Sequence, residues 1–543
     1  MGPAGLARCA TPVTASSLSL GPIDRLTERA DTLAGAWAAR ARASTTVGRE
    51  RALLRLCGVG GLDAAGRPLA WAVVDRYLAG RRGRLGGGLL LPFAMALVEY
   101  DLQPQRLALD IASGAVDLGM EAELLREPDR RAVAEEEARR LASTAIERID
   151  ANRTARRELL DVLGDPPRPW IGATLADPEI EEAITAARRA LDAGVDLVQV
   201  SVPIGRELAE RLRDAGLDAP VWRPLGGESA ADDDAHVPTG SQRALTALRR
   251  HLDEIAAQRR NYVRLGAVPP ALGGPELAVV AAFERIDVAE ADVMTEIVGG
   301  RVAPERALAD HAFAQSLLAR AGVITSLSAG PLVVAPDLAR GVPSDPATRA
   351  GRALALQALS VAIARGNGLP PEQLLVGAMP SWVVGEPQPA ARAAAEVAVR
   401  RSLFDGISLS FEEPPGEMRR SAAEAWSAIV AAIAPPGPAS GLILRRAGAD
   451  SDRAAAASRL AAGITAELAD SVAPPALSGV ALEHARATVA AAVATLELLA
   501  DEGWRSVLGD SLDRPDRAPL GGDSVAERTE MFDPFATVIA APG

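Results

Sequence analysis

Short apolar runs alternate with Ala- and Arg-rich segments of helical spacing from residue 169 to residue 434. The first repeat is the clearest. Trp170 to Leu175 is strand-like, Asp177 and Pro178 are typical of a helix start, and Ala193-Gly194 is typical of a helix end. Strands that alternate with helices in this way lie side by side in a parallel sheet. The pattern therefore predicts an α/β fold.

The number of repeats narrows the prediction further. Eight parallel strands with intervening helices favour a closed (β/α)8 barrel of the triosephosphate isomerase (TIM) type over an open sheet. In such a barrel the chemistry lies at the carboxyl ends of the strands. The predicted strands cover residues 170–175, 195–201, 219–223, 261–266, 285–289, 322–327, 373–378 and 406–411.

The sequence before residue 169 and after residue 434 lacks this alternation of strand-like and helical segments. We expect residues 1–22 to form a disordered tail and residues 23–168 to form a helical accessory region, because apolar residues recur there at three- and four-residue spacing. The barrel is expected over residues 169–434. A Pro-rich linker then opens a C-terminal helical extension, residues 435–543, with an irregular tail.

The net charge and the number of cysteines limit which partners and which cellular compartment fit the protein. The 71 acidic residues outnumber the 58 basic ones and give a net charge of −13, which is unsuited to nucleic acid. Two cysteines fit a reducing cytosol. The longest apolar run, Leu85 to Val98, is shorter than the roughly 20 residues of a membrane helix. We predict a soluble, cytoplasmic protein without nucleic-acid or membrane partners.

The chain contains no lysine, so that every basic side chain besides histidine is an arginine. Its richness in Ala, Gly and Pro points to biased codon usage as the cause. The chemical consequence holds in any case. An enzyme that uses pyridoxal phosphate (PLP) anchors the cofactor on a lysine, and a P-loop ATPase needs a lysine at its phosphates. The chain by itself is therefore neither of these.

No metal-binding pattern is present. The four histidines are isolated, and none belongs to a metalloprotease motif or a nucleophile elbow. The segment Asp234 to Gly240 is one residue too long for the DxHxxG loop with which cobalamin domains supply a histidine ligand, and it is interpreted as a chance match. The polar residues predicted at the barrel mouth are Asp177, Ser201, Arg206, Arg223, Arg264, Asp287, Asp292, Thr325, Ser326, Ser328, Ser381, Ser410 and Glu412.

Four stretches of the chain, in this order, resemble segments of one family. They are Ser44 to Asp63, Asn152 to Asp165, Pro275 to Asp292, and Asp513 to Phe535. The family is that of the α subunit of lysine 5,6-aminomutase, and the similarity runs through nearly the whole chain. The resemblance implies a PLP-binding barrel with accessory helices.

The same resemblance implies a division of labour between two chains. A small β subunit would supply the cobalamin-binding domain and the lysine that holds PLP. Adenosylcobalamin would provide a radical that abstracts a substrate hydrogen, and PLP would carry the migrating amino group of lysine or β-lysine. A chain without lysine and without a DxHxxG loop is compatible with this arrangement.

Site residues follow from the resemblance. It implies that Arg206 and Ser241 face the PLP phosphate, that Asp292 faces a substrate ammonium group, and that Arg264 contributes to pocket electrostatics. The chain also departs from the family at its pocket. Val202, Val268 and Ala378 stand where the family has arginine, tyrosine and histidine, and a Gly- and Thr-rich loop is shortened to residues 237–242. These departures leave an alternative open, namely a catalytically silent barrel paralogue that acts as a scaffold or binding protein.

Overall fold

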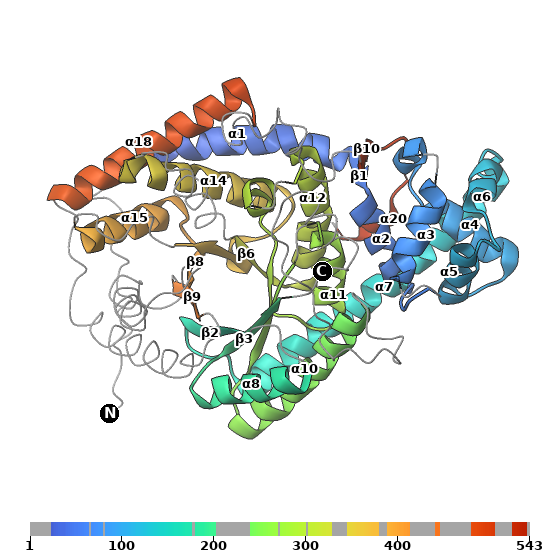
Figure 1. Cartoon of the computed structure of the whole chain (residues 1–543), viewed down its shortest axis with the longest axis horizontal. Coiled ribbons are helices and arrows are strands. Elements are labelled where there is room, and N and C mark those ends of the chain that lie inside the picture. The colour runs from blue at the N-terminus through green and yellow to red at the C-terminus, as the bar shows by residue number, and fades with distance from the viewer. Residues whose placement is uncertain are drawn as a thin grey trace, which may run out of the picture.

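A computed structural model describes residues 23–63, 67–79, 82–175, 180–201, 239–269, 272–299, 302–327, 345–378, 388–412, 440–445, 479–504, 524–530 and 532–539. Its centre is a closed barrel of eight parallel strands, each paired with the next and the last paired with the first, which confirms the predicted TIM-type fold (Figure 1). The strands are β2 (Trp170–Leu175), β3 (Leu197–Ser201), β4 (Arg264–Val268), β5 (Val288–Glu290), β6 (Ile324–Leu327), β7 (Leu374–Gly377), β8 (Ser408–Glu412) and β9 (Ser440–Arg445).

The strand that closes the barrel differs from the prediction. Seven predicted strands overlap β2 to β8, whereas the predicted strand at 219–223 lies outside the described residues. The closing strand is β9, which pairs with β8 on one side and β2 on the other. Its apolar core, Leu442 to Leu444, follows the Pro-rich segment that was predicted to be a linker after the barrel. The barrel therefore extends past residue 434.

The inside of the barrel is packed. Trp170, Leu197, Val288, Leu375, Leu442 and Leu444 form one buried apolar cluster, with Ile324 against it. Gly172 faces this cluster, and a Cβ atom there would lie 2.8 Å from Leu444 Cδ1. Residues that alternate with the cluster, such as Ile171 and Ala289, belong to the larger core under the helices. The amino half of the barrel is thus a filled core rather than a channel.

Carboxylates at the amino ends of the strands tie neighbouring strands together. Asp196, just before β3, accepts a hydrogen bond from Ile171 N at 2.9 Å. Asp287, just before β5, accepts one from Leu265 N at 2.8 Å. Asp287 also accepts hydrogen bonds from Tyr262 Oη at 2.9 Å and Arg249 Nη1 at 3.1 Å, and all three side chains are buried. This end of the barrel holds a structural network.

Six helices pack around the strands where the structure describes them. Helix α12 carries the signals expected from the sequence, with Pro304 in its first turn and Gly322 in the left-handed conformation at its end. The helices are α8 (Ile180–Asp192), α10 (Thr239–Arg259), α11 (Gly274–Phe283), α12 (Pro304–Ala321), α14 (Pro346–Gly366) and α15 (Pro389–Leu403).

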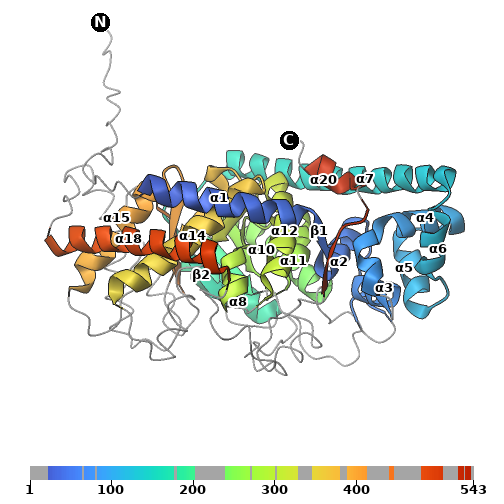
Figure 2. The same ribbon diagram turned by 90° about the horizontal axis from the view of Figure 1, so that it is seen from above.

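The N-terminal region forms a lobe beside the barrel. Figure 1 shows α3 to α6 gathered at one side of the molecule, and Figure 2 shows the long helix α7 running from this lobe across the barrel. The helices are α1 (Ile23–Arg42), α2 (Val47–Leu56), α3 (Leu69–Leu78), α4 (Leu90–Tyr100), α5 (Pro104–Ser113), α6 (Leu118–Leu124) and α7 (Pro128–Leu163), with the 3-10 turn η1 (Arg82–Gly87) before α4.

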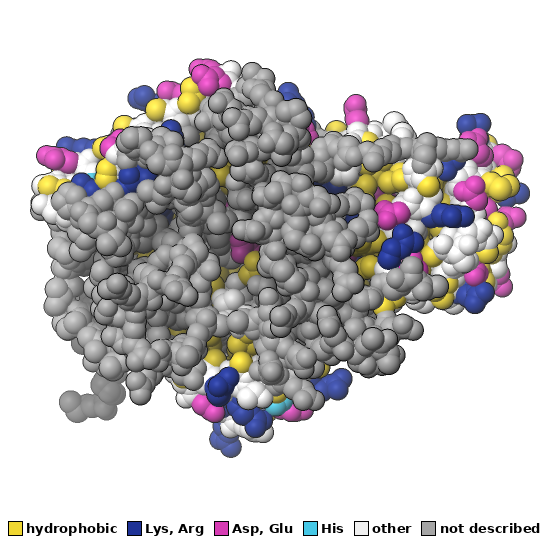
Figure 3. Space-filling model, viewed as in Figure 1, with side chains coloured by type: hydrophobic (Ala, Val, Ile, Leu, Met, Phe, Trp, Pro, Cys, Tyr) yellow, Lys and Arg dark blue, Asp and Glu magenta, His cyan; other side chains and the backbone are white. Residues whose placement is uncertain are grey.

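Charges of both signs cover this lobe. On the face shown in Figure 3, basic and acidic side chains lie interspersed over the described atoms of the lobe. Arg130, for example, pairs with Glu99 at 3.0 Å, and both side chains are exposed. Exposed pairs of this kind contribute about 0–1 kcal/mol. The described part of this face therefore carries a mixed rather than a single-sign surface.

The C-terminal extension packs back on the barrel. Helix α18 (Gly479–Glu502) lies along α14, α15 and α1 (Figures 1 and 2). Gly351 of α14 permits a close approach, because a Cβ atom there would lie 2.5 Å from Ala491 Cβ and 2.8 Å from Thr488 O. Trp504 stacks on Trp37 of α1 with ring centroids 4.6 Å apart. Among the described helices, none is long and apolar enough to cross a membrane.

Candidate functional site

The carboxyl half of the barrel interior is polar. Thr174, Gln199, Glu290, Ser326 and Ser410 share the inward parity of the apolar cluster below them, two or more residues further along their strands. Glu290 stands opposite Ser326 in the β5–β6 pair, and Ser410 stands opposite Gly377 in the β7–β8 pair. The barrel therefore changes from an apolar floor to a lining of hydroxyl, amide and carboxylate groups at the end where TIM barrels bind ligands.

Asp292 lies just beyond β5, as predicted for a mouth residue. Its Oδ1 accepts hydrogen bonds from Ser360 Oγ at 2.5 Å and Met294 N at 3.0 Å, and its Oδ2 accepts one from Thr295 Oγ1 at 3.3 Å. Only 2% of Asp292 is exposed, and Ser360 is fully buried in α14. The carboxylate thereby joins the loop after β5 to a helix of the outer ring.

The chain after Asp292 forms an unusual turn. Residues Thr295–Gly299 (η2) are a π-helix, a form that occurs mostly as single turns and frequently at functional sites. Within it, Glu296 Oε2 lies 3.4 Å from Nε2 of the buried His311. Burial lowers the pKa of His311, but the attraction of Glu296 and other carboxylates outweighs this, so the pKa lies above its ordinary value. The attraction between the two side chains favours the charged imidazole and links α12 to the turn behind Asp292.

Arg264 is placed differently from the prediction. It is the first residue of β4, at the amino end of the barrel, whereas Asp292 follows the carboxyl end of β5. Its guanidinium lies 3.8 Å from the Trp170 ring centroid and bonds to Asp165 Oδ1 at 2.5 Å. The predicted strand began three residues too early, at 261 instead of 264, which shifted Arg264 toward the wrong end. Asp287 was misplaced in the same way.

The side chains of two other predicted site residues lie outside the described part of the chain. Arg206 lies outside the described residues, and of Ser241 the structure describes the helical backbone in α10 but not the side chain. Both stay predictions. Val268 and Ala378 do lie at the mouth, since Val268 ends β4 and Ala378 N donates to Ser410 O at 2.7 Å. Of the other predicted mouth residues, those outside the described ranges are Asp177, Arg223, Ser328 and Ser381.

The helices supply contacts that sequence reasoning missed. Gln315 of α12 donates from Nε2 to Ala291 O at 2.7 Å, and Gln357 of α14 donates to Gly377 O. Both carbonyls lie at the carboxyl ends of strands, β5 and β7 respectively. The available signal was a polar residue inside an apolar helix, as with Gln357 and Ser360 in the buried run from Leu354 to Ile363. Polar groups at fully buried positions require partners.

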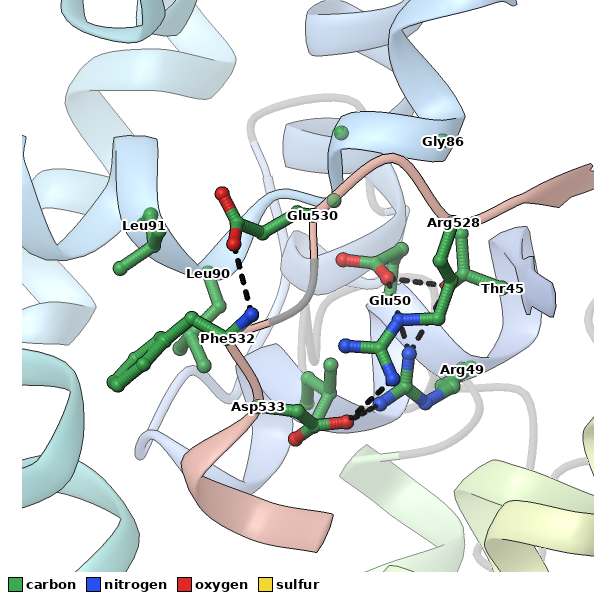
Figure 4. Close-up of a pocket in the computed structure, with 13 residues that line it drawn as sticks. Thr45, Arg49, Glu50, Gly86, Leu90, Leu91, Arg528, Glu530, Phe532 and Asp533 are labelled. Atoms are coloured by element: carbon green, nitrogen blue, oxygen red, sulfur yellow. Dashed lines mark hydrogen bonds and ion pairs between the residues drawn. The ribbon is translucent and has the colours of Figure 1, made fainter. Parts of the chain in front are cut away.

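A cavity of about 30 Å³ lies elsewhere, between the N-terminal lobe and the C-terminus (Figure 4). Strand β10 (Val525–Glu527) pairs there with β1 (Ser44–Thr46). Arg49 and Arg528 both contact the Asp533 carboxylate, the latter at 3.0 Å. Burial opposes ionisation of Asp533, but the two arginines outweigh it and lower its pKa. A cavity of this volume has room for about one water molecule and is too small for a substrate.

The residues around this cavity come from two of the stretches that resemble the family, the first and the last. Thr45, Arg49 and Glu50 belong to the first stretch and Asp533 to the last, and the fold brings them together around one cavity. Glu50 accepts hydrogen bonds from Thr45 Oγ1 at 2.6 Å and Leu89 N at 2.8 Å. These residues fasten the C-terminal strand to the lobe. Across the described residues, no group of three or more His, Cys, Asp or Glu side chains is arranged to hold a metal ion.

Comparison with known proteins decides the family. The model of the "D-Lysine 5,6-aminomutase TIM-barrel domain of alpha subunit" matches residues 17–418, which is more than half of the chain. The chain belongs to this family. The matched range ends before β9 and α18, so the strand that closes the barrel and the helix against α14 lie beyond it.

Two curated relatives of the chain have names that agree with this family. The chain is 26% identical over 373 residues to the lysine 5,6-aminomutase alpha subunit of Fusobacterium nucleatum subsp. nucleatum, covering 68% of this chain and 66% of that protein. It is 27% identical over 334 residues to that of Acetoanaerobium sticklandii, covering 61% of this chain and 59% of that protein. The matched part thus spans less than two thirds of each relative.

A solved structure of Yersinia pestis dihydropteroate synthase aligns with 56% of this chain and 93% of its own, at 15% identity and a TM-score of 0.31. At that score the likeness adds nothing to the assignment. The fold rests on the closed barrel itself.

Proposed function

We propose that the protein is the barrel subunit of a radical aminomutase that moves an amino group on lysine, β-lysine or a related amino acid. The observation that carries the proposal is the family match over residues 17–418 on a closed barrel whose carboxyl half is lined by polar side chains. The relatives are named alpha subunits, which supports a second chain as partner. We infer a small β subunit with a cobalamin-binding domain and a lysine for PLP.

The side chains of this chain are compatible with noncovalent binding of PLP but not with a covalent bond to it. The chain has no lysine, so an anchoring amine has to come from the partner. Ser326 and Ser410 lie on the inner side of the barrel strands toward its carboxyl end, where a bound cofactor would lie. When bound, PLP would supply the group that carries the amino nitrogen, and adenosylcobalamin the radical that starts the reaction.

The barrel's own part in such a reaction is binding, orientation and exclusion of water. We propose that Arg206 and Ser241 face the PLP phosphate, where a cation and a hydroxyl would each donate hydrogen bonds. We propose that Asp292 acts near the substrate ammonium group. Its three hydrogen-bond donors hold its carboxylate in one orientation, which a binding group requires. The apolar side chains packed inside the amino half of the barrel limit the entry of solvent from that end.

The test is reconstitution with a partner. The full chain would be co-purified with a small protein that carries a DxHxxG loop and a lysine, supplied with both cofactors, and assayed for amino-group migration on lysine and β-lysine. Turnover that requires both chains supports the proposal. A stable complex that binds both cofactors and turns over neither substrate would favour the silent barrel.

A further inference from the structure

One buried carboxylate joins three elements at the carboxyl end of the barrel. Glu296 lies in the turn η2 after β5, and its Oε1 accepts a hydrogen bond from Leu272 N, in the loop after β4, at 3.1 Å. Its Oε2 lies 3.4 Å from Nε2 of His311 in α12. Glu296 and His311 are 7% and 1% exposed. The loops that follow two neighbouring strands are therefore tied to each other and to α12 through Glu296.

The turn that carries Glu296 also holds Asp292. Met294 N donates to Oδ1 of Asp292 at 3.0 Å, and Thr295 Oγ1 donates to its Oδ2 at 3.3 Å. Glu296 N donates to the backbone carbonyl of Asp292 at 3.3 Å. Because these donors lie in η2 or directly before it, a shift of the turn would change the orientation of the Asp292 carboxylate.

Both segments that Glu296 joins have backbone conformations that are uncommon. Leu272 has a φ of 65°, in the left-handed region that residues other than glycine seldom adopt. The turn η2 is a π-helix, which is rare as well. Conformations of this kind persist where surrounding contacts hold them, and they cluster at active sites and ligand clamps. The hydrogen bond to Leu272 and the contact with His311 are contacts that hold these two segments.

Charges around His311 favour its contact with Glu296. The carboxylates that attract the imidazole are Glu296 in η2, Asp292 before it and Asp310 at the preceding position of α12. Asp310 is itself paired with Arg306, one turn earlier in the same helix. Burial lowers the pKa of His311, but the carboxylates raise it above its ordinary value. A charged imidazole at this place keeps the Glu296 carboxylate against α12.

We propose that Glu296 is a positioning residue, which His311 holds in place and which sets the orientation of Asp292 at the barrel mouth. The inference rests on the proposed function, since it takes Asp292 to act near the substrate ammonium group. Glu296 is buried, and its role does not require contact with the ligand. Loss of Glu296 should weaken substrate binding through Asp292 and should loosen the loops after β4 and β5 at the same time.

Amide hydrogen exchange of the full chain, resolved to single residues by mass spectrometry, measures how firmly the two loops are held without any cofactor. The amide of Leu272 reports on the bond to Glu296, and the amide of Met294 reports on the orientation of Asp292. The variants are Glu296→Ala, Glu296→Gln, His311→Gln, and the double variant with both glutamines. Glu296→Gln keeps an acceptor for Leu272 N and removes the charge.

Two matched controls make the same replacements elsewhere. Glu305→Gln removes an exposed carboxylate from the first turn of α12. His251→Gln removes an imidazole whose Nδ1 lies 3.5 Å from Glu254 in α10. Both controls should match the wild type at the two amides. Far-UV circular dichroism checks the fold of each variant, and if Glu296→Ala does not fold, Glu296→Gln decides the outcome.

Glu296→Ala should speed exchange of both amides about ten- to a hundredfold, the value of a hydrogen bond to a charged group. Glu296→Gln and His311→Gln should each speed it by a smaller factor. The double variant should exchange no faster than the faster single variant, because the two side chains act through one contact. The inference is overturned if only one of the two amides responds, if neither responds more than in the controls, or if the two single effects multiply in the double variant.

Kinetics of the reconstituted complex separate positioning from a purely structural role. Glu296→Ala should raise KM for lysine about tenfold and change kcat little, because the residue acts on binding through Asp292. A lower kcat at an unchanged KM would contradict the inference. Failure of the proposed function is distinct from this, since the wild-type complex would then not turn over lysine. The exchange rates would still decide whether Glu296 holds the two loops and Asp292.

Discussion

Replacing Asp287 by Asn is expected to destabilise the barrel strongly while leaving its shape intact. Asp287 is 1% exposed and accepts hydrogen bonds from Arg249 Nη1, Tyr262 Oη and Leu265 N at 2.8 to 3.1 Å. Arg156 Nε lies 3.3 Å from its Oδ1. Burial raises the pKa of Tyr262, which keeps its hydroxyl as a donor. Asn retains the volume but not the charge, and its NH2 group faces donors.

The magnitude follows from the buried arginines. Arg156 and Arg249 are 6% and 3% exposed, so without Asp287 their charges stay in the interior with reduced compensation. Removal of one partner of a buried pair costs about 3 to 5 kcal/mol. Asp253, 2.8 Å from Arg249, retains part of the compensation, which places the expected loss toward the lower value.

Urea-induced unfolding measures this loss as a shift of the midpoint at constant slope. The matched control is Asp110→Asn, which removes an exposed pair with Arg106 and is expected to cost about 0.5 kcal/mol or less. If Asp287→Asn lost no more free energy of unfolding than this control, the argument that the amino end of the barrel depends on a buried charge network would be refuted.

Four further outcomes are expected. Gly351→Val should lower the free energy of unfolding by about 1 to 3 kcal/mol, because α18 leaves no space for a side chain; an unchanged urea midpoint would contradict this. Ser360→Ala should cost about 1 to 3 kcal/mol by leaving Asp292 short of a buried donor, whereas Ser360→Thr, which keeps the hydroxyl, should cost less in the same assay. Asp533, whose pKa is lowered in the fold, contributes stability that is present above its ordinary value of 3.8 and is lost as pH falls below it; Tm of Asp533→Asn between pH 2 and 5 should therefore vary less with pH than Tm of the wild type. Arg206→Ala should weaken PLP binding by the complex with its partner about ten- to a hundredfold, and an unchanged Kd would remove Arg206 from the site.

The sequence predicted the position of one site residue correctly and misplaced two others. Asp292 was correctly expected just past a strand end, because the strand and the helix that flank it have strong local signals. Arg264 and Asp287 were assigned to the wrong end, since a three-residue error in where a strand begins moves a side chain from one end of a short strand to the other. Local apolar runs mark that a strand exists, whereas pairing with its neighbours sets its limits.

The sequence by itself determined the architecture. Apolar runs, helix starts at Pro and Asp, and helix ends at Gly are local features that depend on neighbouring residues, so they predict alternating strands and helices and hence a parallel barrel. Tertiary structure decided which residues that are distant in the sequence come into contact. Ser360 meets Asp292 across 68 positions, Arg49 meets Asp533 across 484, and β9 closes the barrel against β2. Such contacts depend on how whole elements pack, and no spacing within either segment specifies its distant partner.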